Sequence, residues 1–458
     1  MNIVFLVPKS DIPEGIREEV FASVLPIEYL GVGYLSACLY DRGFTSFIID
    51  AEISGLSPND LENDLLSRRI DLLCITCNQY QYNNVEDIVK RIVGKGFDGK
   101  IIMGGQLPTL ALEELASYLP EVDWFLIGEG EVELPKLVEY MQSGDKGILD
   151  AISGLSSRKK HKSWTIPKPA IALHSLDSLS FPFHYAMAWE KKKLGRTQIV
   201  PGILSSRGCG WNSCTFCSTA AANRRIKGGG EWRTRSPEDV VAEIAEVQET
   251  YGSEHFVFVD EDVLGAGFGV RRFREIIQVL RAEGIRIQFQ IPCRSSDVNY
   301  ELFEELKDAG LERALIGFES ISDQCLAYLN KGILSSQNFR TVQVLKRLGI
   351  DINPGLIPFH PNSTIDQVKA DFHFLVEVIG YNEKHKYQKR LLPDFNTPLF
   401  YQLLREKRLK GRFPSFMYEF DDRQVQRLYN RLKEQVLSSN AFESDPIALY
   451  ETVQKWGR

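Results

Sequence analysis

Short apolar runs alternate with segments of helical periodicity along the first third of the chain. Five runs flanked by turn residues predict strands at residues 3–7, 45–50, 71–76, 100–103 and 124–127. Between them, apolar positions recur at helical spacing, and one helix is expected to begin near Tyr29 and to end near Gly43. Apolar strands that alternate with helices are typical of a parallel, doubly wound sheet. We therefore predict an α/β domain of this type over residues 1–145.

The same alternation of strand and helix returns over residues 198–395. Strands are expected at residues 199–205, 255–260, 285–291, 314–318, 352–357 and, more weakly, 387–392. Ser236-Pro237 is a helix N-cap followed by proline at the first helical position, and apolar residues follow at helical spacing. Such repeats close into a full or partial (β/α)6 barrel, with its chemistry at the carboxyl ends of the strands. Residues 146–197 are expected to form a connector, and residues 396–458 a small, mainly helical C-terminal region.

Glycine-rich turns follow the last two strands of the first domain, at residues 104–106 and 128–130. Ligands of doubly wound sheets bind beyond the carboxyl ends of the strands, and glycine lets the backbone approach a bulky ligand. Two glycines after a strand are by themselves more often only a tight turn. The turns therefore indicate where a ligand would bind, without identifying it.

Three cysteines, Cys209, Cys214 and Cys217, fall within nine residues directly after the first expected barrel strand. Three thiolates so close together can bind one soft metal centre from a single loop, and they are one short of a closed zinc or Fe–S site. The next histidine and cysteine are the distant His255 and Cys293. The spacing favours an Fe–S cluster with one open coordination position over its alternative, a zinc-stabilised binding module.

Length and composition limit the class of protein. A chain of 458 residues, 43% hydrophobic and 25% charged, is expected to fold into two to three globular domains. The net charge of −7 argues against broad binding of nucleic acid. Eight scattered cysteines do not form a disulfide framework, and neither a signal peptide nor a run of transmembrane length is recognisable. A cytoplasmic location is expected.

Three further features are interpreted as structural. Cys74 and Cys77 have C-x-x-C spacing, but the alternation of a strand places them on opposite faces, as packing residues. The charge run at residues 158–162 is expected to be a solvated face of a hairpin. His360 is interpreted as a turn histidine rather than a proton-transfer group.

The cysteine loop resembles the cluster-binding loop of the radical S-adenosylmethionine (SAM) enzymes. That family usually has C-x3-C-x2-C with an aromatic residue before the third cysteine. Cys214-Thr215-Phe216-Cys217 fits the second half, whereas four residues separate Cys209 from Cys214. The loop therefore matches a variant of the motif with a longer first gap.

The turns of the first domain look like the cobalamin-binding domain that precedes many radical SAM enzymes. The resemblance includes Pro26 and residues 31–35 as well as the two glycine-rich turns. Other cobalamin-binding domains supply an axial histidine from an Asp-x-His-x-x-Gly loop. That loop is absent here, where the first histidine is His161. The resemblance thus implies a Rossmann-like domain that binds cobalamin without a histidine ligand, followed by a radical SAM barrel.

The resemblance also implies the cofactors and their contacts. The cofactors would be a [4Fe–4S] cluster, SAM and cobalamin. The expected cluster ligands are Cys209, Cys214 and Cys217, and the expected SAM contacts are Phe216, Asp260, Arg294, Glu319 and Ser320. The expected cobalamin contacts are Thr76, Gly104, Gly105, Gln106, Gly128, Glu129 and Gly130. No catalytic residue can be assigned.

The implied activity is methyl transfer to an unactivated carbon through a 5′-deoxyadenosyl radical and methylcobalamin. The substrate would be a small molecule, a lipid or a peptide, and the electron donor a flavodoxin or ferredoxin. One alternative is a non-methylating radical enzyme, such as a cyclase, with or without cobalamin. Another is a tRNA-modifying enzyme that inserts sulfur, which would need a further cysteine cluster and is disfavoured by the acidic charge. Neither a nucleic acid nor a membrane span is expected.

Overall fold

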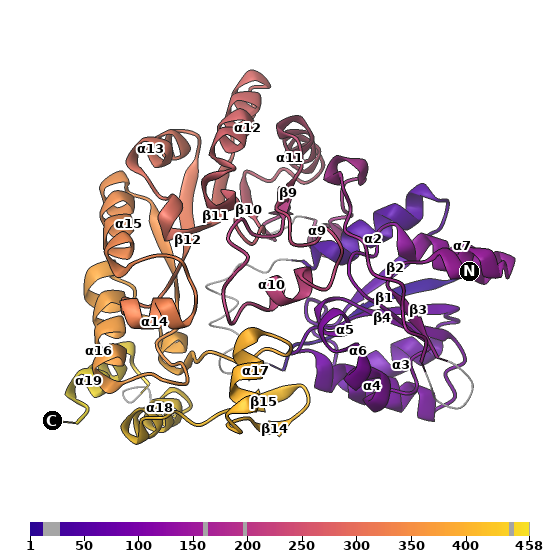
Figure 1. Cartoon of the computed structure of the whole chain (residues 1–458). Helices are drawn as coiled ribbons and strands as arrows, with labels where there is room; N and C mark the ends of the chain where they lie inside the picture. The colour runs from indigo at the N-terminus through magenta and orange to yellow at the C-terminus, as the bar shows by residue number, and fades with distance from the viewer. Residues whose placement is uncertain (12–27, 159–163, 196–198, 439–443, 458) are drawn as a thin grey trace.

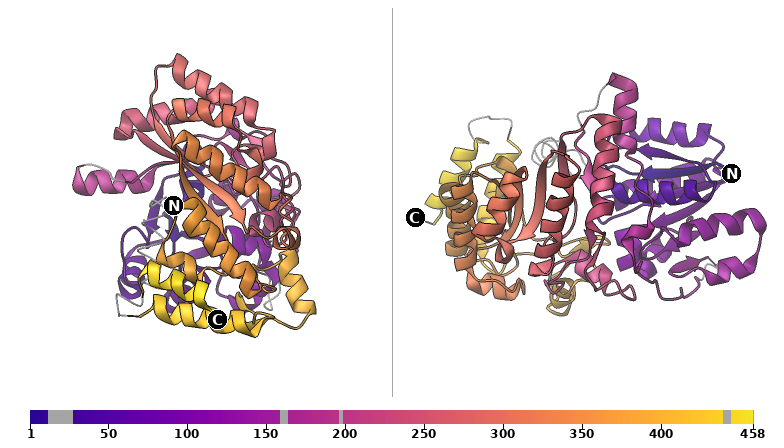
Figure 2. Two further views of the ribbon diagram at one scale, coloured as in Figure 1. Left: turned by 90° about the vertical axis from the view of Figure 1, so that its left-hand side faces the viewer. Right: turned by 90° about the horizontal axis from the view of Figure 1, so that it is seen from above.

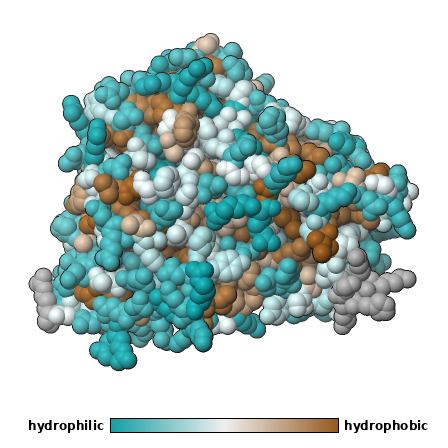
Figure 3. All heavy atoms as spheres, viewed as in Figure 1, coloured by the Kyte–Doolittle hydropathy of each residue, from teal (hydrophilic) through white to brown (hydrophobic). Residues whose placement is uncertain are grey.

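A computed structural model describes residues 1–11, 28–158, 164–195, 199–438 and 444–457, and shows two α/β units side by side (Figure 1). Pro26, His161, Gln198 and most of the charge run at 158–162 lie outside the described residues. Within the described ranges, no helix has the length and apolarity needed to cross a membrane. The face seen in Figure 3 is mainly hydrophilic, with apolar patches interspersed.

The N-terminal sheet has six strands in the order β2-β1-β3-β4-β5-β6, and only the pair β5 and β6 is antiparallel. The strands are β1 (Ile3–Val7), β2 (Ser46–Asp50), β3 (Leu72–Thr76), β4 (Lys100–Gly104), β5 (Trp124–Leu126) and β6 (Leu155–Ser157). The five predicted strands are confirmed to within one residue at each end. The antiparallel edge strand β6 was not predicted.

Helices cover both faces of this sheet, as a doubly wound fold requires. They are α2 (Leu30–Asp41), α3 (Pro58–Ser67), α4 (Tyr82–Gly94), α5 (Gln106–Leu110), α6 (Leu112–Tyr118), α7 (Glu133–Ser143) and α8 (Lys146–Ala151). Apolar side chains of α2 and α7 share one core with the sheet, and those of α3, α4 and α6 share the other. Cys74 belongs to the first core and Cys77 to the second, so their prediction as packing residues on opposite faces is confirmed.

The second sheet has five parallel strands in the order β13-β12-β11-β10-β7. They are β7 (Gly202–Ile203), β10 (His255–Phe258), β11 (Gln288–Arg294), β12 (Leu311–Glu319) and β13 (Asp351–Leu356). The main helices around them are α11 (Pro237–Tyr251), α12 (Val270–Ala282), α13 (Tyr300–Asp308), α14 (Asp323–Tyr328), α15 (Ser335–Leu348) and α16 (Ile365–His373). Ser236 caps α11 by accepting from Asp239 N, with Pro237 in the first turn, as predicted.

The structure corrects three strand predictions. The segment at residues 387–392 is not a strand: it follows a 3-10 helix (Lys384–Gln388) and makes only one parallel bridge, between Phe359 and Arg390. The first strand is reduced to two residues because the preceding Pro201 has no N–H to donate to the ladder. β11 begins three residues later than expected and continues through Arg294. The barrel is therefore partial and open.

The C-terminal region packs against both units. It contains α17 (Pro398–Arg405), β14 (Lys410–Arg412), β15 (Ser415–Met417), α18 (Arg423–Val436) and α19 (Pro446–Lys455). Phe395, Phe400 and Phe413 belong to a core of the N-terminal sheet, whereas Leu428 and Leu449 belong to the barrel core. In the two views of Figure 2, α18 and α19 lie on the outer side of the barrel, away from the N-terminal sheet.

Four short elements lie at or near the junction of the two units. They are α9 (Tyr185–Leu194), β8 (Ser206–Arg207), α10 (Ser218–Asn223) and β9 (Arg233–Thr234). The cysteine loop runs between β8 and α10, after β7 and next to the carboxyl ends of the N-terminal strands.

Candidate active site

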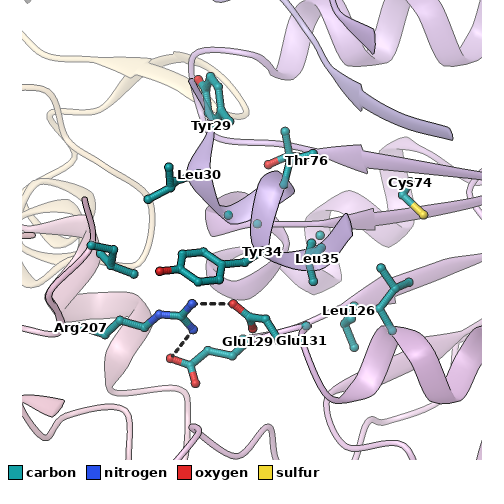
Figure 4. A pocket seen from close by; sticks show the side chains of 18 of the residues that line it. Tyr29, Leu30, Tyr34, Leu35, Cys74, Thr76, Leu126, Glu129, Glu131 and Arg207 are labelled. Carbon is teal, nitrogen blue, oxygen red and sulfur yellow. Dashed lines mark hydrogen bonds and ion pairs between the residues drawn. The ribbon is translucent and has the colours of Figure 1, made fainter. Parts of the chain in front are cut away.

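A cavity of about 380 Å³ lies between the two units, at the carboxyl ends of β3, β4 and β5 (Figure 4). Its inner wall is apolar and includes Phe5, Cys74 and Leu126 from the sheet. Its opposite wall comes from the barrel unit and includes Arg207 and Gly208, the two residues before Cys209. The cavity thus borders both the glycine-rich turns and the cysteine loop.

Glycines leave open space in the wall of this cavity. Among the described residues, a Cβ atom built at Gly31 would meet no atom within 4 Å, and one at Gly104 would meet only Leu126 O at 3.8 Å. Gly105 instead has φ of 100° and lies close to Cys77 O, so this position requires glycine for the turn itself. Gly31 and Gly104 therefore leave room that a ligand can fill.

Six of the seven residues predicted to contact cobalamin line the cavity: Thr76, Gly104, Gly105, Gly128, Glu129 and Gly130. The seventh, Gln106, is not among the lining residues, and its Nε2 donates to Ser218 Oγ at 3.2 Å, beside Cys217. Gln106 thus connects the turn after β4 with the end of the cysteine loop.

Two arginines of the barrel unit bind the turn after β5. Arg207 Nη2 donates to Glu131 Oε1 at 2.6 Å, and Arg233 donates to both carboxylate oxygens of Glu129, at 2.7 and 3.0 Å. We call these four residues the interdomain clamp. Although burial opposes charge, Arg233 and Arg207 bring the pKa of Glu129 below its ordinary value. Figure 4 shows Tyr34 next to Arg207, whose guanidinium lies 5.6 Å from the Tyr34 ring centre.

The cysteine loop presents three free, partly buried thiols. Cys217 Sγ accepts from Ala220 N at 3.4 Å and so caps α10, while Cys209 Sγ lies 3.8 Å from Asp262 Oδ2. The thiol of Cys217 is close enough to those of Cys209 and Cys214 for electrostatic interaction. The loop therefore gathers all three predicted sulfur ligands in one place.

The longer first gap of the motif contains Trp211, which fixes the loop to the chain after α14. Trp211 Nε1 donates to Asn330 O at 2.8 Å, and Asn330 Nδ2 donates to Ser213 O at 2.7 Å. A Cβ atom at Gly332 would lie 2.3 Å from the Trp211 ring, so only glycine admits this packing. Thr215 N also donates to Leu329 O at 3.0 Å. The departure from the usual spacing is thus an ordered turn with its own hydrogen bonds.

Burial raises the pKa of all three thiols, that of Cys214 to about 11, although the nearby Lys331 acts in the opposite direction. Thiols of this kind become good ligands only when a metal displaces the proton. Among the described residues, no three His, Cys, Asp or Glu side chains converge closely enough for a single metal ion. A four-iron cluster binds each cysteine through a separate iron and so accepts more widely spaced thiols.

Two of the predicted SAM contacts lie together beside the loop. Lys331 Nζ donates to Glu319 Oε1 at 2.7 Å, directly over Gly317, where a Cβ atom would lie 2.7 Å from that Nζ. Arg294 Nη2 donates to Lys331 O at 2.7 Å, and its guanidinium lies 4.9 Å from the Trp211 ring centre. Arg294 and Glu319 therefore border the same space as the thiols.

The other predicted SAM contacts have protein partners. Asp260 accepts from Ser205 N and Ser205 Oγ, at 3.1 and 2.8 Å, and from Ser206, as a strand-end cap does. Ser320 Oγ donates to the buried Asp371 at 3.0 Å. Phe216 is half-buried against the barrel core. These three assignments remain predictions, and for Asp260 and Ser320 the observed bonds are structural.

His360 lies in a turn, as interpreted from the sequence. Its Nδ1 accepts from Asn362 N at 3.4 Å, and its Nε2 faces Gln367 Nε2 at 2.8 Å. Burial lowers the pKa of His360 to about 4, so the ring is neutral at physiological pH.

Comparison with known proteins gives two family matches. The radical SAM superfamily matches residues 203–375, and the B12 binding domain matches residues 22–138. The chain contains a radical SAM domain and a B12-binding domain. The cofactors of this combination are a [4Fe–4S] cluster, SAM and cobalamin.

Three relatives show how widely this combination is used. An uncharacterized methyltransferase of Pyrococcus horikoshii is 26% identical over 82% of this chain and 77% of its own length. A hopanoid C-3 methylase of Methylococcus capsulatus is 26% identical over 73% of this chain and 61% of its own. An anaerobic magnesium-protoporphyrin IX monomethyl ester cyclase of a Synechocystis strain is 25% identical over 70% and 62%, respectively. The chain thus spans about three fifths of the last two proteins.

Two solved structures share the fold. The cobalamin-dependent SAM radical enzyme OxsB, with aqua-cobalamin and SAM bound, superposes with a TM-score of 0.75 at 20% identity, over 95% of this chain and 66% of its own. The radical SAM methyltransferase TsrM of Kitasatospora setae gives a TM-score of 0.62 at 17% identity, over 82% and 71%. The arrangement of a doubly wound sheet before a partial barrel is therefore that of a cobalamin-binding radical SAM enzyme.

The residues that line the cavity are chemically compatible with a corrin and its nucleotide tail. Three buried polar atoms at its wall have no partner: Glu131 Oε2, Asn223 Nδ2 and Arg233 Nε. An unpaired buried polar atom is unfavourable, and the amide groups around a corrin can both donate to and accept from such atoms. The apolar inner wall suits a flat aromatic base, and the glycines leave space at the rim.

Sequence reasoning missed the barrel residues of this cavity, above all Arg207, Arg233 and Asn223. The only sign of them in the sequence is that two arginines, Arg207 and Arg233, lie on either side of the cysteine loop. The contacts join positions 76 and 104 residues apart in the clamp, so no local pattern indicates them.

Proposed function

We propose that this protein is a cobalamin-dependent radical SAM methyltransferase that acts on an unactivated carbon. The observation that carries the proposal is the junction itself, where three free thiols on one loop adjoin a glycine-lined cavity of the B12-binding domain. When bound, the cofactors supply an electron to SAM, a 5′-deoxyadenosyl radical and a transferable methyl group. The protein binds, orients and shields them.

The assignment of residues follows from position. We assign cluster binding to Cys209, Cys214 and Cys217, because no other described cysteine lies on this loop. Trp211 and Asn330 hold the loop in place through their hydrogen bonds. We assign residues 1–145 to the cobalamin-binding domain and residues 198–395 to the barrel, with the connector and C-terminal region at 146–197 and 396–458.

The residues beside the loop support binding of a zwitterionic amino acid. SAM carries both an amino and a carboxyl group, and Glu319 and Arg294 offer one charge of each sign at the same place. Thr76 and the two glycine-rich turns are proposed to contact cobalamin, with the interdomain clamp closing that side. Among the described residues that line the cavity there is no histidine.

A non-methylating radical reaction is the second candidate, because a cyclase stands among the relatives beside two methylating enzymes. Cyclisation or rearrangement would use the same cluster and the same radical. The product would then lack the mass of the methylene unit that methyl transfer adds. Product mass therefore separates the two candidates.

The substrate is proposed to be a small molecule, a lipid or a peptide, and the electron donor a flavodoxin or a ferredoxin. All eight cysteines are free, which suits a reducing cytoplasm.

Anaerobic assay tests the proposal. The purified protein should show a brown [4Fe–4S] absorbance, bind cobalamin and convert SAM to 5′-deoxyadenosine and, with its substrate, to S-adenosylhomocysteine. Formation of 5′-deoxyadenosine without S-adenosylhomocysteine and without a mass gain in a converted substrate would support the second candidate. Zinc in place of iron, with no cleavage of SAM, would overturn both.

A further inference from the structure

Three cations lie around the inner side of the barrel near Glu319, and two of them have protein partners. Lys331 is paired with Glu319, and Arg294 donates to Lys331 O and lies against Trp211. The third, Lys389, makes no hydrogen bond or ion pair through its ammonium group with any residue that the structure describes. Its electrostatic partner is Glu319, which Lys331 already neutralises.

The backbone places Lys389 on the inner side of the barrel. Leu391 N donates to Phe359 O at 2.7 Å, and Phe359 bridges Arg390, so this segment runs beside the end of β13 where a sixth strand would lie. Phe359 and Arg390 both lie 5.2 Å from the ring centre of Tyr429 on α18, so that side faces outward. Successive side chains of an extended segment point to opposite sides. Lys389, in extended conformation before Arg390, therefore faces inward.

The basic neighbours of Lys389 on the same turn, His385 and Lys386, are shifted toward their neutral forms. Burial, with a contribution from Lys389, lowers the pKa of His385 to about 4 and that of Lys386 to about 7, although Glu383 acts in the opposite direction on Lys386. Burial lowers the pKa of Lys389 itself, although its side chain is accessible. Protein atoms therefore surround Lys389 while part of its side chain stays open to a ligand, and its ammonium group has no counter-ion of its own among the described residues.

We propose that Lys389 binds an anionic group of the substrate, a carboxylate or a phosphate, on the barrel wall near Glu319. This inference rests on the proposed function, because it places the substrate in the barrel above the cluster loop. The anion of the substrate supplies the negative counter-charge that the protein does not offer to Lys389. An anion bound there directs the rest of the substrate toward the space beside Cys214, which Lys331 also faces. Lys389 thus selects acidic substrates over neutral ones.

The first test uses pyridoxal 5′-phosphate, an anionic aldehyde, as the probe. The lysine amine and the aldehyde form an imine with loss of water, and added cyanoborohydride reduces the imine to a stable secondary amine. The labelled peptide of the anaerobic, cobalamin-loaded protein is then identified by mass spectrometry. We expect Lys389 to be labelled to the same extent with and without SAM, and saturating inorganic phosphate, added in the presence of SAM, to reduce that labelling about tenfold.

The second test measures phosphate binding through the thermal unfolding midpoint of three variants. Phosphate should raise the midpoint of the wild type and of K389R, but not of K389Q. K384Q, on the same turn, is the matched control and should respond like the wild type.

Two outcomes would overturn the inference. One is labelling of Lys389 that phosphate leaves unchanged, together with an equal response of K389Q to phosphate. The other is complete protection by SAM alone, which would assign Lys389 to the cofactor. Neither readout needs turnover, so a failure of methyl transfer would leave the anion site standing, and a failure of the anion site would leave SAM cleavage standing.

Discussion

Arg207 and Glu131 join the cysteine loop to the cavity between the two units. Arg207 precedes Cys209 by two residues, and its 2.6 Å hydrogen bond ends on the turn after β5 that borders this cavity. The cluster loop and the cavity therefore share one contact. A change at this contact should affect both cofactors, which distinguishes it from a change in either domain alone.

Replacing Arg207 with methionine tests this relationship. The variant leaves Glu131 buried without its partner, which should cost about 3 kcal/mol of unfolding free energy and reduce cobalamin retention. R42M is the matched control, because the Arg42–Glu139 pair is exposed and its loss should cost at most about 1 kcal/mol. Urea titration and the corrin absorbance of the purified variants measure the two effects. Wild-type values for R207M in both would contradict the role of the clamp.

Gly31 offers a way to block the cavity without disturbing the fold. Because no atom of the described residues lies within 4 Å of its Cβ position, G31L should fold with a stability within about 1 kcal/mol of the wild type. The leucine side chain would occupy space meant for the cofactor, so bound cobalamin should fall sharply. G94L is the control, since Gly94 is also helical and unhindered but lies in α4, away from the cavity. Equal cobalamin content in the two variants would show that the cofactor binds elsewhere.

Trp211 tests the loop without removing a cysteine. W211F loses both the hydrogen bond to Asn330 O and the indole atoms that pack on Gly332, which should weaken the loop by at least about 1 kcal/mol and lower the iron content after exposure to air. W189F is the control, because Trp189 is exposed on α9. Iron and sulfide analysis gives the result. Equal loss of iron in both variants would show that Trp211 does not stabilise the cluster loop.

The protonation of His184 should make the free energy of unfolding depend on pH. Its Nδ1 lies 2.5 Å from Glu28 Oε1 and its Nε2 lies 3.6 Å from Glu243 Oε1. Burial opposes the charged ring, but Glu243 and Glu28 raise the pKa of His184 to about 9. A raised histidine pKa contributes stability that is complete below the unfolded value and is lost as the pH rises through the folded value.

Unfolding free energy should therefore fall by about 3 kcal/mol between pH about 6.5 and about 9 in the wild type, beyond any change seen in H184Q. H255Q should keep the wild-type slope, because His255 is exposed. Urea titrations at several pH values measure these slopes. Parallel curves for the wild type and H184Q would refute the charged state of His184.

The sequence predicted the elements that local pattern determines. The strands of the N-terminal sheet are apolar runs with flanking turns, and the three cysteines of the loop are close in sequence as well as in space. The structure also places Gly31 and the glycine-rich turns at one cavity, as expected for the ends of parallel strands.

The errors arose where distant contacts decide the outcome. The segment around Arg390 has a strand-like composition, but its guanidinium lies among Tyr418, Phe420 and Tyr429, and only one bridge to the sheet forms. Ser320 remains a predicted SAM contact, and its hydrogen bond to Asp371, 51 positions away, is a contact that sequence spacing does not indicate. The clamp arginines likewise meet their glutamates across the domain boundary, so sequence spacing could not indicate them.

The most direct test of the account is cleavage of SAM by the reconstituted protein and by a variant with Cys209, Cys214 and Cys217 all replaced by alanine. We predict that the wild type and C325A, whose cysteine lies in the barrel core, assemble a [4Fe–4S] cluster and release 5′-deoxyadenosine. The triple variant should bind cobalamin but release none. Undiminished 5′-deoxyadenosine from the triple variant would contradict the claim that these thiols hold the cluster.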